Sequence, residues 1–224
     1  MYPLNRTTGV NGVHANVCLD EQWSKEAIEK KVASVRQKYW RFVNGAYGPE
    51  ETETLYETLK THNKALYDKH VLVVGSEKPW VESLLLELGA RHVTTLEYNK
   101  IQSTHPQVTT IHHNDLISKN NVGTYDAVVA YSSIEHSGLT RYGDAPHPWG
   151  DLVTMAKLWC YIKDDGWAFI GIPTSPIDTI YFNAGRSYGA LMLSHLFSNW
   201  KLKVASWPFE SQDGKKITFV LNKA

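Results

Sequence analysis

The sequence has few cysteines, no excess of charge of either sign and no long apolar run. Its two cysteines, Cys18 and Cys160, belong to no Cys-x-x-Cys pair, so we expect free thiols rather than a disulfide framework, a structural zinc site or a redox pair. The 23 lysines and arginines equal the 23 aspartates and glutamates. This balance argues against a dedicated nucleic-acid binder or a polybasic membrane binder.

No stretch of the sequence has the pattern expected of a segment that directs a protein into or across a membrane. No apolar run approaches the ~18 residues of a membrane span, and the N-terminus lacks the charged-then-apolar order of a secretory signal. We therefore expect a cytoplasmic protein without a membrane span; the alternative is that a leader has been trimmed from the chain. With 224 residues, of which 42% are hydrophobic and 21% charged, the chain is long enough for one packed domain with an appendage.

The first 66 residues are expected to form an arm followed by two helices. Apolar residues recur every three or four positions from Trp23 to Asn44, which predicts one helix, and Pro49 to Leu66 predicts another. The first helix is basic and the second begins with glutamates, so we expect the two to offset each other's charge; a basic face that meets phosphate is the alternative. We expect this helical region to act as a lid, with Tyr39 and Trp40 closing over a ligand.

Beyond residue 66, short β-branched runs alternate with helical patterns. The predicted strands are Val71–Val74, His92–Leu96, Val108–His112, Tyr125–Ala130 and Trp167–Ile172, and the predicted helices begin at Lys78, Leu152 and Tyr188. This alternation indicates right-handed crossovers and a mostly parallel sheet. The last two runs, Lys203–Pro208 and Ile217–Leu221, flank Gln-Asp-Gly-Lys, which predicts an antiparallel β-hairpin. A dehydrogenase sheet would end with another parallel strand instead.

The ends of the predicted strands carry polar residues, and ligands of open α/β sheets bind beyond the carboxyl ends of the strands. Gly75 and Ser76 follow the first strand, where a glycine lets a ligand approach the backbone. Glu97 ends the second strand, where an acidic side chain accepts both hydroxyl protons of a ribose. Asp115 follows the third, where it could accept from an adenine amino group; the alternative is a turn capped together with Asn114.

The loop after the fourth strand, from Glu135 to Asp151, is rich in glycine, proline and aromatic residues. Long loops of such content in compact domains are usually functional. His136 is a candidate general base, because the pKa of histidine lies near working pH; the alternative is a histidine bonded to a backbone carbonyl. Asp144, His147 and Asp151 could bind a divalent metal, but they lack a diagnostic spacing, so we expect no metal site.

A second polar cluster follows the fifth strand. Arg186, close in sequence to Asn183, could clamp a carboxylate or phosphate of an acceptor. The alternative is that Arg186 pairs with Asp178 or Asp144.

Six motifs between Tyr67 and the C-terminus carry a likeness to a known family. They are Val-Val-Gly-Ser-Glu-Lys-Pro-Trp-Val-Glu, Val-Thr-Thr-Leu-Glu-Tyr, Ser-Ser-Ile-Glu-His-Ser-Gly-Leu, Arg-Tyr-Gly-Asp, Pro-Trp-Gly-Asp-Leu and Phe-Asn-Ala-Gly-Arg. The chain resembles an uncharacterised family that was first catalogued from Caenorhabditis as a domain of unknown function and is methyltransferase-like in fold. The wider resemblance is to class I S-adenosylmethionine-dependent methyltransferases, whose mostly parallel sheet also ends in an antiparallel hairpin.

The resemblance implies an α/β, Rossmann-like class I methyltransferase domain over residues 67–224. The helical patterns before it predict an N-terminal extension over residues 1–66, made of an arm and a helical lid. It implies S-adenosylmethionine as cofactor, held at the expected cofactor-binding residues Gly75, Ser76, Glu97, Tyr98, Asp115, Leu116, Ser132 and Ser133. One departure matters, because class I enzymes usually have Gly-x-Gly-x-Gly in the first loop and this chain has one glycine followed by Ser-Glu-Lys-Pro. The missing glycines also argue against a nicotinamide dinucleotide.

The sequence therefore predicts methyl transfer from S-adenosylmethionine to a hydroxyl of a small-molecule or sugar-like acceptor, with no nucleic acid as partner. His136 is the expected base, helped by Glu135 or Asp144. The residues expected to shape the acceptor site are Arg141, Tyr142, His147, Trp149, Asn183 and Arg186. Two alternatives stay open, namely a non-catalytic methyltransferase-like binding or regulatory protein with a degraded cofactor loop, and a different enzyme with an adenosine ligand. The sequence indicates neither the acceptor nor the oligomeric state.

Overall fold

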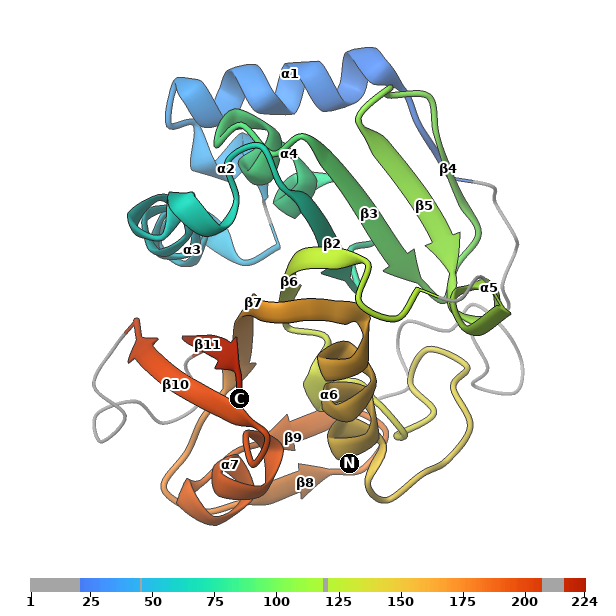
Figure 1. Cartoon of the computed structure of the whole chain (residues 1–224), viewed down its shortest axis with the longest axis vertical. Helices are drawn as coiled ribbons and strands as arrows, with labels where there is room; N and C mark the ends of the chain where they lie inside the picture. Colours follow the sequence, from blue (N-terminus) through green and yellow to red (C-terminus); the bar gives the residue numbers. More distant parts are fainter. Residues whose placement is uncertain (1–20, 45, 119–120, 207–215) are drawn as a thin grey trace.

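The computed structural model describes residues 21–44, 46–118, 121–206 and 216–224, arranged around one central sheet (Figure 1). In spatial order its strands are β10 (Trp200–Ala205), β11 (Lys216–Lys223), β7 (Ile162–Pro173), β6 (Tyr125–Tyr131), β2 (His70–Val74), β3 (His92–Glu97) and β5 (Val108–His112). The five strands from β7 to β5 are parallel, whereas β11 lies antiparallel between β7 and β10. The predicted parallel sheet with a final antiparallel hairpin is confirmed. Cys18, the predicted arm and the predicted hairpin turn lie outside the described residues.

Both faces of the central strands of the sheet are buried, as the continuous apolar runs predict. Because side chains alternate along a strand, Val71 and Val73 of β2 join one core cluster while Leu72 and Val74 join the other. All four side chains are buried. Full burial of one such side chain contributes roughly 1.5–3 kcal/mol, so the two clusters together hold the sheet between its helical layers.

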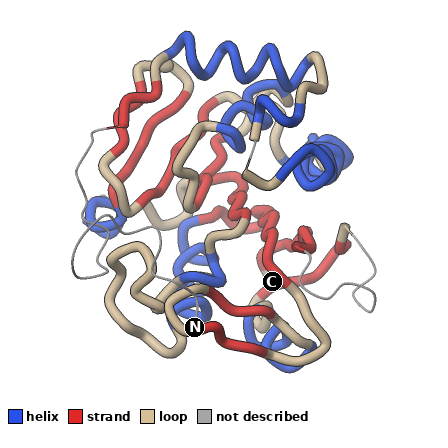
Figure 2. The backbone as a smooth tube through the Cα atoms, turned by 180° about the vertical axis from the view of Figure 1, so that it is seen from behind, coloured by secondary structure: helices blue, strands red, loops and turns tan. Residues whose placement is uncertain are grey.

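Helices cover the sheet on both sides (Figures 1 and 2). The first cluster draws on α1 (Lys25–Arg36), α3 (Gly48–Thr61) and α4 (Trp80–Glu87). The second draws on α5 (His113–Ser118), α6 (Gly150–Tyr161) and α7 (Ala190–Leu196). The N-terminal helices therefore share a hydrophobic core with the sheet rather than forming a core of their own.

The predicted helix from Trp23 to Asn44 is divided in two, and the prediction of one continuous helix is wrong. Helix α1 ends at Arg36, and α2 (Trp40–Val43) begins after Lys38, whose φ is +58°. The amide of Lys38 donates to the carbonyl of Val35, and the next amide donates five residues back, which is the hydrogen-bond pattern of a Schellman ending. Such an ending usually has glycine at the left-handed position, so a lysine there gives no signal in the sequence.

The other N-terminal prediction is closer to the structure. The predicted helix from Pro49 to Leu66 is observed as α3 followed by a short 3₁₀ turn, η1 (Asn63–Ala65). The charges of α1 and α3 are not paired with each other in the part of the chain that the structure describes. Arg36 of α1 pairs with Glu87 of α4 at 2.8 Å, and Glu51 of α3 pairs with Lys216 of β11 at 3.6 Å.

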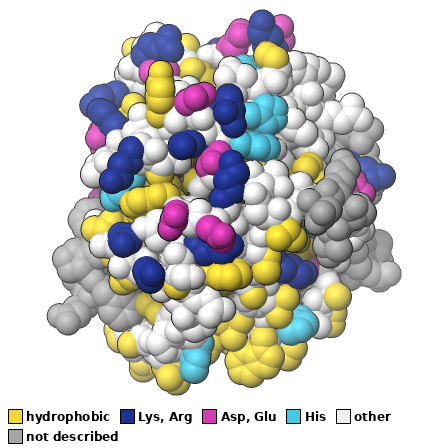
Figure 3. All heavy atoms as spheres, in the orientation of Figure 1, with side chains coloured by type: hydrophobic (Ala, Val, Ile, Leu, Met, Phe, Trp, Pro, Cys, Tyr) yellow, Lys and Arg dark blue, Asp and Glu magenta, His cyan; other side chains and the backbone are white. Residues whose placement is uncertain are grey.

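Two pairs of three-residue strands were not predicted, since such short strands carry no periodicity. Strand β1 (Glu21–Trp23) pairs with β4 (Ile101–Ser103), and β8 (Thr179–Tyr181) pairs with β9 (Gly185–Ser187). On the face shown in Figure 3, charged side chains of both signs are interspersed and hydrophobic side chains gather at the end that holds β8, β9 and α7. Among the described residues, no helix has both the length and the apolar character needed to cross a bilayer.

Candidate functional site

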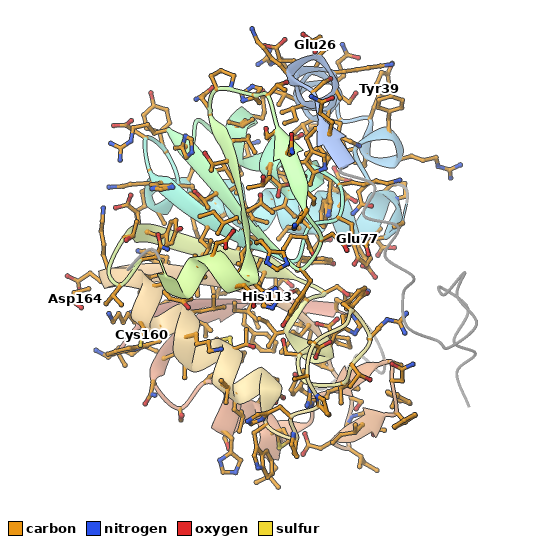
Figure 4. The ribbon with its side chains drawn as sticks, turned by 90° about the vertical axis from the view of Figure 1, so that its right-hand side faces the viewer. Glu26, Tyr39, Glu77, His113, Cys160 and Asp164 are labelled. Carbon is orange, nitrogen blue, oxygen red and sulfur yellow. The ribbon has the colours of Figure 1, made fainter. Side chains whose placement is uncertain are left out.

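A cavity of about 850 Å³ lies at the carboxyl ends of the parallel strands. The sheet edge contributes Gly75 after β2, Glu97 at the end of β3, and Ser132 and Ser133 after β6. Figure 4 looks onto this side of the molecule, with Glu77 of the loop after β2 near the N-terminal helices and His113 closer to the middle of the view. The position agrees with the rule that ligands bind beyond the carboxyl ends of strands.

The N-terminal region closes part of this cavity, but not through the residues that the sequence suggested. Tyr39 is 62% exposed, and Trp40 is buried in the core with its ring 5.1 Å from that of Tyr56; neither lines the cavity. The lining residues of this region are Lys31, Phe42, Val43, Asn44, Ala46 and Tyr47. A glycine-rich segment with a tyrosine, Asn-Gly-Ala-Tyr-Gly, lies between the two predicted helices and is a signal that could have identified Asn44, Ala46 and Tyr47, but not the other three.

The loop after β2 depends on Gly75, whose φ is +73°. A Cβ at this position would lie 2.7 Å from the Cβ of Ser133, so the loops that follow β2 and β6 touch here and leave no room for a side chain. The single glycine of the first loop is therefore required by both its backbone conformation and its close contact.

Ser76 lies under this loop rather than in the cavity. Its side chain is 1% exposed, and its hydroxyl donates to the carbonyl of Lys78 at 2.7 Å. The same hydroxyl is 3.0 Å from one carboxyl oxygen of Glu82, while Thr95 donates to the other at 2.6 Å. Burial raises the pKa of Glu82 to about 7, although these hydrogen bonds lower it. Glu82 thus supports the loop from below, a role that its place within an amphipathic helix did not indicate.

Glu97 is a buried carboxylate that faces the cavity. It is 7% exposed, and the amide of Tyr98 donates to its Oε1 at 2.8 Å. Burial raises the pKa of Glu97 to about 7, while hydrogen bonds from backbone amides lower it. Next to it, the ring of Tyr98 lies 4.3 Å from the ring of His113, which gives the cavity an aromatic wall.

The expected adenine residues are only partly brought to the cavity. Leu116 lines it, whereas Asp115 is exposed and does not. Strand β5 ends at His112 and α5 begins at once, so His113 and Leu116, three residues apart, share the helix face that meets the cavity. Asp115 lies on another face of α5, and the helical turn after β5 is the reason.

His136 lines the cavity at the end of η2 (Ile134–His136). Its Nδ1 bonds to the backbone carbonyl of Ala184, and since a carbonyl can only accept, Nδ1 carries a proton and, in the neutral ring, Nε2 carries the lone pair. Nε2 lies 3.6 Å from Oε1 of Glu135. A histidine bonded to a backbone carbonyl was the alternative to a catalytic base. The contact with Ala184 is such a bond, and it also fixes the tautomer that a base requires.

Glu135 is a buried acid behind this histidine. It is 1% exposed and does not line the cavity, and Ser132 donates to its Oε1 at 2.8 Å. Burial raises the pKa of Glu135 to about 7, while the bond from Ser132 lowers it. Tyr47 lies near Ser132, and burial raises the pKa of Tyr47 to about 12. The N-terminal region therefore reaches Ser132, whose hydroxyl donates to Glu135.

Asp144 lines the cavity, but its carboxylate is occupied by the loop that contains it. It accepts from the amide of Gly138 at 2.6 Å and from the amides of Thr140 and Tyr142 at 3.4 Å each. Asp144 therefore holds the turns of the loop together. The ring of Tyr142, which also lines the cavity, lies 5.4 Å from the ring of His136.

Arg186 is a structural residue of the loop rather than part of the cavity wall. It is 3% exposed, and its guanidinium pairs with Asp151 at 3.4 Å instead of with Asp178 or Asp144. It also donates to the backbone carbonyls of Glu135, Ser137 and Pro148. Arg186 thereby joins both ends of the segment between β6 and α6, and its charge is fully used inside the protein.

Most of the other expected acceptor residues also lie outside the cavity. Tyr142 lines it, whereas Arg141, His147, Trp149, Asn183 and Arg186 do not. Arg141 donates to the carbonyl of Asn183 at 3.1 Å, and the exposed His147 accepts from the amide of Trp149 at 3.1 Å. Within the described ranges, no three histidine, cysteine or carboxylate side chains gather closely enough to hold a metal ion.

Comparison with known families shows to which family the chain is related. A family model described as "Caenorhabditis protein of unknown function, DUF268" matches residues 68–223, which is well over half of the sequence. The chain belongs to this family. The resemblance that the sequence motifs indicated is confirmed. No curated protein sequence matches the chain.

Solved structures share the fold of this family member at low sequence identity. The 1,6-didemethyltoxoflavin-N1-methyltransferase of Burkholderia thailandensis, solved with 1,6-didemethyltoxoflavin and S-adenosylhomocysteine, has a TM-score of 0.61 and 15% identity over 88% of this chain and 87% of its own. An S-adenosylmethionine dependent methyltransferase from Mesorhizobium loti has a TM-score of 0.53 and 7% identity over 76% and 98%. The predicted Rossmann-like class I methyltransferase fold is thereby confirmed.

Proposed function

We propose that this protein is an S-adenosylmethionine-dependent methyltransferase that methylates a hydroxyl of a small-molecule or sugar-like acceptor. The observation that carries the proposal is the buried carboxylate of Glu97 at the end of β3, facing a cavity that begins at Gly75. An acidic residue at this place in an open α/β sheet is positioned to bind a ribose. A neighbour of the same fold that was solved with S-adenosylhomocysteine supports this choice of ligand.

The lining residues fit an adenosine-containing cofactor. The cavity volume of about 850 Å³ lies in the range of roughly 300–1,000 Å³ that is usual for such ligands. Glu97 would accept the two ribose hydroxyls, which supply the donors that its buried carboxylate needs when ionised. Tyr98, His113 and Leu116 would enclose the flat adenine ring. When bound, S-adenosylmethionine supplies an electrophilic methyl group.

A hydroxyl acceptor requires a group that removes its proton, and His136 is suited to that role. Its Nε2 carries the lone pair because Nδ1 is bonded to Ala184. The imidazolium that forms on proton uptake would be stabilised by Glu135, whose carboxyl oxygen lies 3.6 Å away and is oriented by Ser132. The walls of the cavity would hold the acceptor oxygen in line with the methyl group, and this orientation supplies much of the acceleration.

One observation favours a second candidate, a non-catalytic binding or regulatory protein with the same fold. The loop after β2 has a single glycine, includes Pro79, which lacks an amide hydrogen, and directs the amide of Trp80 to the carbonyl of Lys78 at 2.7 Å. The loop thus offers fewer backbone donors to a ligand than a glycine-rich loop does. Binding and turnover, measured separately, distinguish the two candidates.

Calorimetry with S-adenosylhomocysteine tests the ligand. We expect the full chain to bind it, and Glu97→Ala to weaken binding by more than about tenfold, because a charge-assisted hydrogen bond contributes roughly 1.5–3 kcal/mol. The matched control is Asp115→Ala, which removes a nearby carboxylate that does not line the cavity and should change the affinity by less than about twofold. Absence of binding at millimolar ligand would contradict the proposal.

The base is tested by turnover. Acceptors are screened among hydroxylated small molecules and sugars, with formation of S-adenosylhomocysteine as the readout. His136→Ala should abolish turnover while leaving the affinity for S-adenosylhomocysteine nearly unchanged, and His147→Ala, an exposed histidine of the same loop, is the control. Equal losses of affinity and turnover in His136→Ala would argue against a base. If the protein binds S-adenosylhomocysteine but turns over no acceptor, and His136→Ala binds this ligand as the wild type does, the non-catalytic candidate is favoured.

A further inference from the structure

Two lysines from distant parts of the chain line the cavity, near enough for their charges to interact. Lys31 belongs to α1 and Lys78 to the loop that follows β2. Lys31 is half-buried, and its ammonium group donates to the carbonyls of Phe42 at 3.2 Å and Val43 at 2.7 Å. An ammonium group has three donors, so these two bonds fix its position and leave one donor for another acceptor.

The electrostatics of this pair point to an anionic ligand. Burial lowers the pKa of Lys31, and the neighbouring positive charge of Lys78 lowers it further. Glu82 opposes this effect, but its carboxyl group lies beneath the loop in contact with Thr95 and Ser76. In the described parts of the chain, neither lysine forms an ion pair with a carboxylate. Lys31 is fixed by its two hydrogen bonds, whereas Lys78 is exposed and follows Glu77, which also lines the cavity. An anion bound by both lysines would relieve the repulsion between them.

The loop itself explains why such a pair is needed. In a glycine-rich loop, backbone amides bind the charged end of a ligand. Here Pro79 has no amide hydrogen and the amide of Trp80 is bonded to Lys78, so side chains must provide the missing donors. Helix α4 begins at Trp80, which also lines the cavity, and its N-terminal dipole adds positive potential at the same place.

We propose that Lys31 and Lys78 form an anion-binding subsite that takes a carboxylate or phosphate group of a ligand in this cavity. Two sources share this chemistry: the amino-acid carboxylate of the cofactor and an anionic group on the acceptor. The subsite lies beside Gly75, one strand away from Glu97, and this favours the cofactor carboxylate. That assignment rests on the proposed function, whereas the subsite itself does not.

The test compares two ligands that differ only in the charged end. S-adenosylhomocysteine carries the amino-acid tail, whereas 5′-methylthioadenosine keeps the adenosine and the sulfur but lacks it. Calorimetry on the full chain should show that Lys78→Met weakens the binding of S-adenosylhomocysteine by about tenfold and changes the affinity for 5′-methylthioadenosine by less than about twofold. Lys31→Met, checked for native circular dichroism because Lys31 also bonds to α2, should act in the same way.

The matched control is Lys30→Met. Lys30 is the neighbour of Lys31 in α1 and lies over the ring of Phe42 at 5.1 Å, but it does not line the cavity. Its removal lowers the net charge by the same amount, so any effect of long-range charge would appear in this variant as well. We expect both ligands to bind it as they bind the wild type.

A third titration with inorganic phosphate, in phosphate-free buffer, distinguishes the sources. If both adenosine ligands bind Lys78→Met normally but phosphate binds only the wild type, the subsite serves an anionic acceptor. If Lys78→Met weakens the binding of S-adenosylhomocysteine and of 5′-methylthioadenosine equally, or if it changes none of the three affinities, the subsite is refuted. If the wild type binds neither adenosine ligand, the proposed function fails, and the phosphate titration alone decides the subsite.

Discussion

The contact between Gly75 and Ser133 gives a prediction whose size follows from the structure. In Gly75→Ala, the new Cβ would lie 2.7 Å from the Cβ of Ser133, and the backbone would have to keep a φ of +73°. The left-handed conformation costs an alanine about 1–2 kcal/mol. Steric overlap with a packed neighbour costs typically about 1–3 kcal/mol more. We therefore expect Gly75→Ala to lower the free energy of unfolding by about 2–5 kcal/mol.

The two contributions can be separated with a double-mutant cycle. Adding Ser133→Gly removes the side chain that the new Cβ would meet, so the double variant should recover about 1–3 kcal/mol relative to the sum of the single changes. The control is Gly123→Ala, because Gly123 has a φ of +62° and its added Cβ would meet nothing within 4 Å. That variant should lose about 1–2 kcal/mol, from backbone strain alone.

Equilibrium unfolding in urea measures all four variants, and calorimetry with S-adenosylhomocysteine measures whether the displaced loop still binds. If the double variant is as unstable as the sum of the singles, the loops after β2 and β6 are not in contact as described. If Gly75→Ala costs no more than Gly123→Ala, the close approach has no energetic consequence and the reasoning is refuted.

Three further predictions concern buried charges. Burial raises the pKa of Glu82 to about 7, so the folded chain keeps a proton that the unfolded chain releases, and the free energy of unfolding should fall as pH rises from about 4.5 to about 7. In urea unfolding, Glu82→Gln should reduce this fall by up to about 3 kcal/mol. An unchanged dependence of the free energy of unfolding on pH in the variant would contradict the burial of Glu82. Burial also raises the pKa of Glu97 to about 7, so calorimetry should find that the affinity for S-adenosylhomocysteine rises with pH through about 7. Glu97→Gln should remove this pH dependence. If the affinity of the wild type does not change with pH, Glu97 does not bind the ribose as a carboxylate. Arg186→Met leaves the buried carboxylate of Asp151 without its charged partner, with only the hydroxyl of Tyr188 donating to it at 3.0 Å. Urea unfolding should therefore show a loss of about 3–5 kcal/mol, part of which adding Asp151→Asn should restore. No restoration would mean that the ion pair is not the cause.

The strands and the sheet could be predicted because their signals are local. A buried parallel strand must be apolar on both faces, and the run from Tyr125 to Ala130 has no other satisfactory environment. The strand ends then place Gly75, Glu97 and Ser133 at one edge of the sheet, so this part of the candidate site follows from topology alone. The left-handed Lys38 could not be predicted, because its conformation depends on how α2 packs and not on the residue type.

The side chains of the loop after β6 were harder to assign. An arginine near several carboxylates has the same appearance in a sequence whether it binds a ligand or supports a loop, and Arg186 is shown to do the latter by its 3% exposure. The Nδ1 contact of His136 with Ala184 joins residues 48 positions apart, which no local pattern reports. The sequence suggested that Asp144 acts through its charge, as a helper of the base. In the structure its carboxylate oxygens accept hydrogen bonds from amide groups of the loop.

The sequence by itself determined the main strands and helices, the parallel sheet with its antiparallel end and the edge at which the cavity lies, since these follow from hydrophobic periodicity and from the handedness of crossovers. Only the tertiary structure decided which polar side chains face the cavity. It brought Lys31, Phe42 and Tyr47 from the N-terminal region to the cavity, turned His113 rather than Asp115 toward it, and buried Arg186. The physical reason is that the direction of a polar side chain depends on the partners that satisfy its hydrogen bonds, and here those partners are distant in the chain.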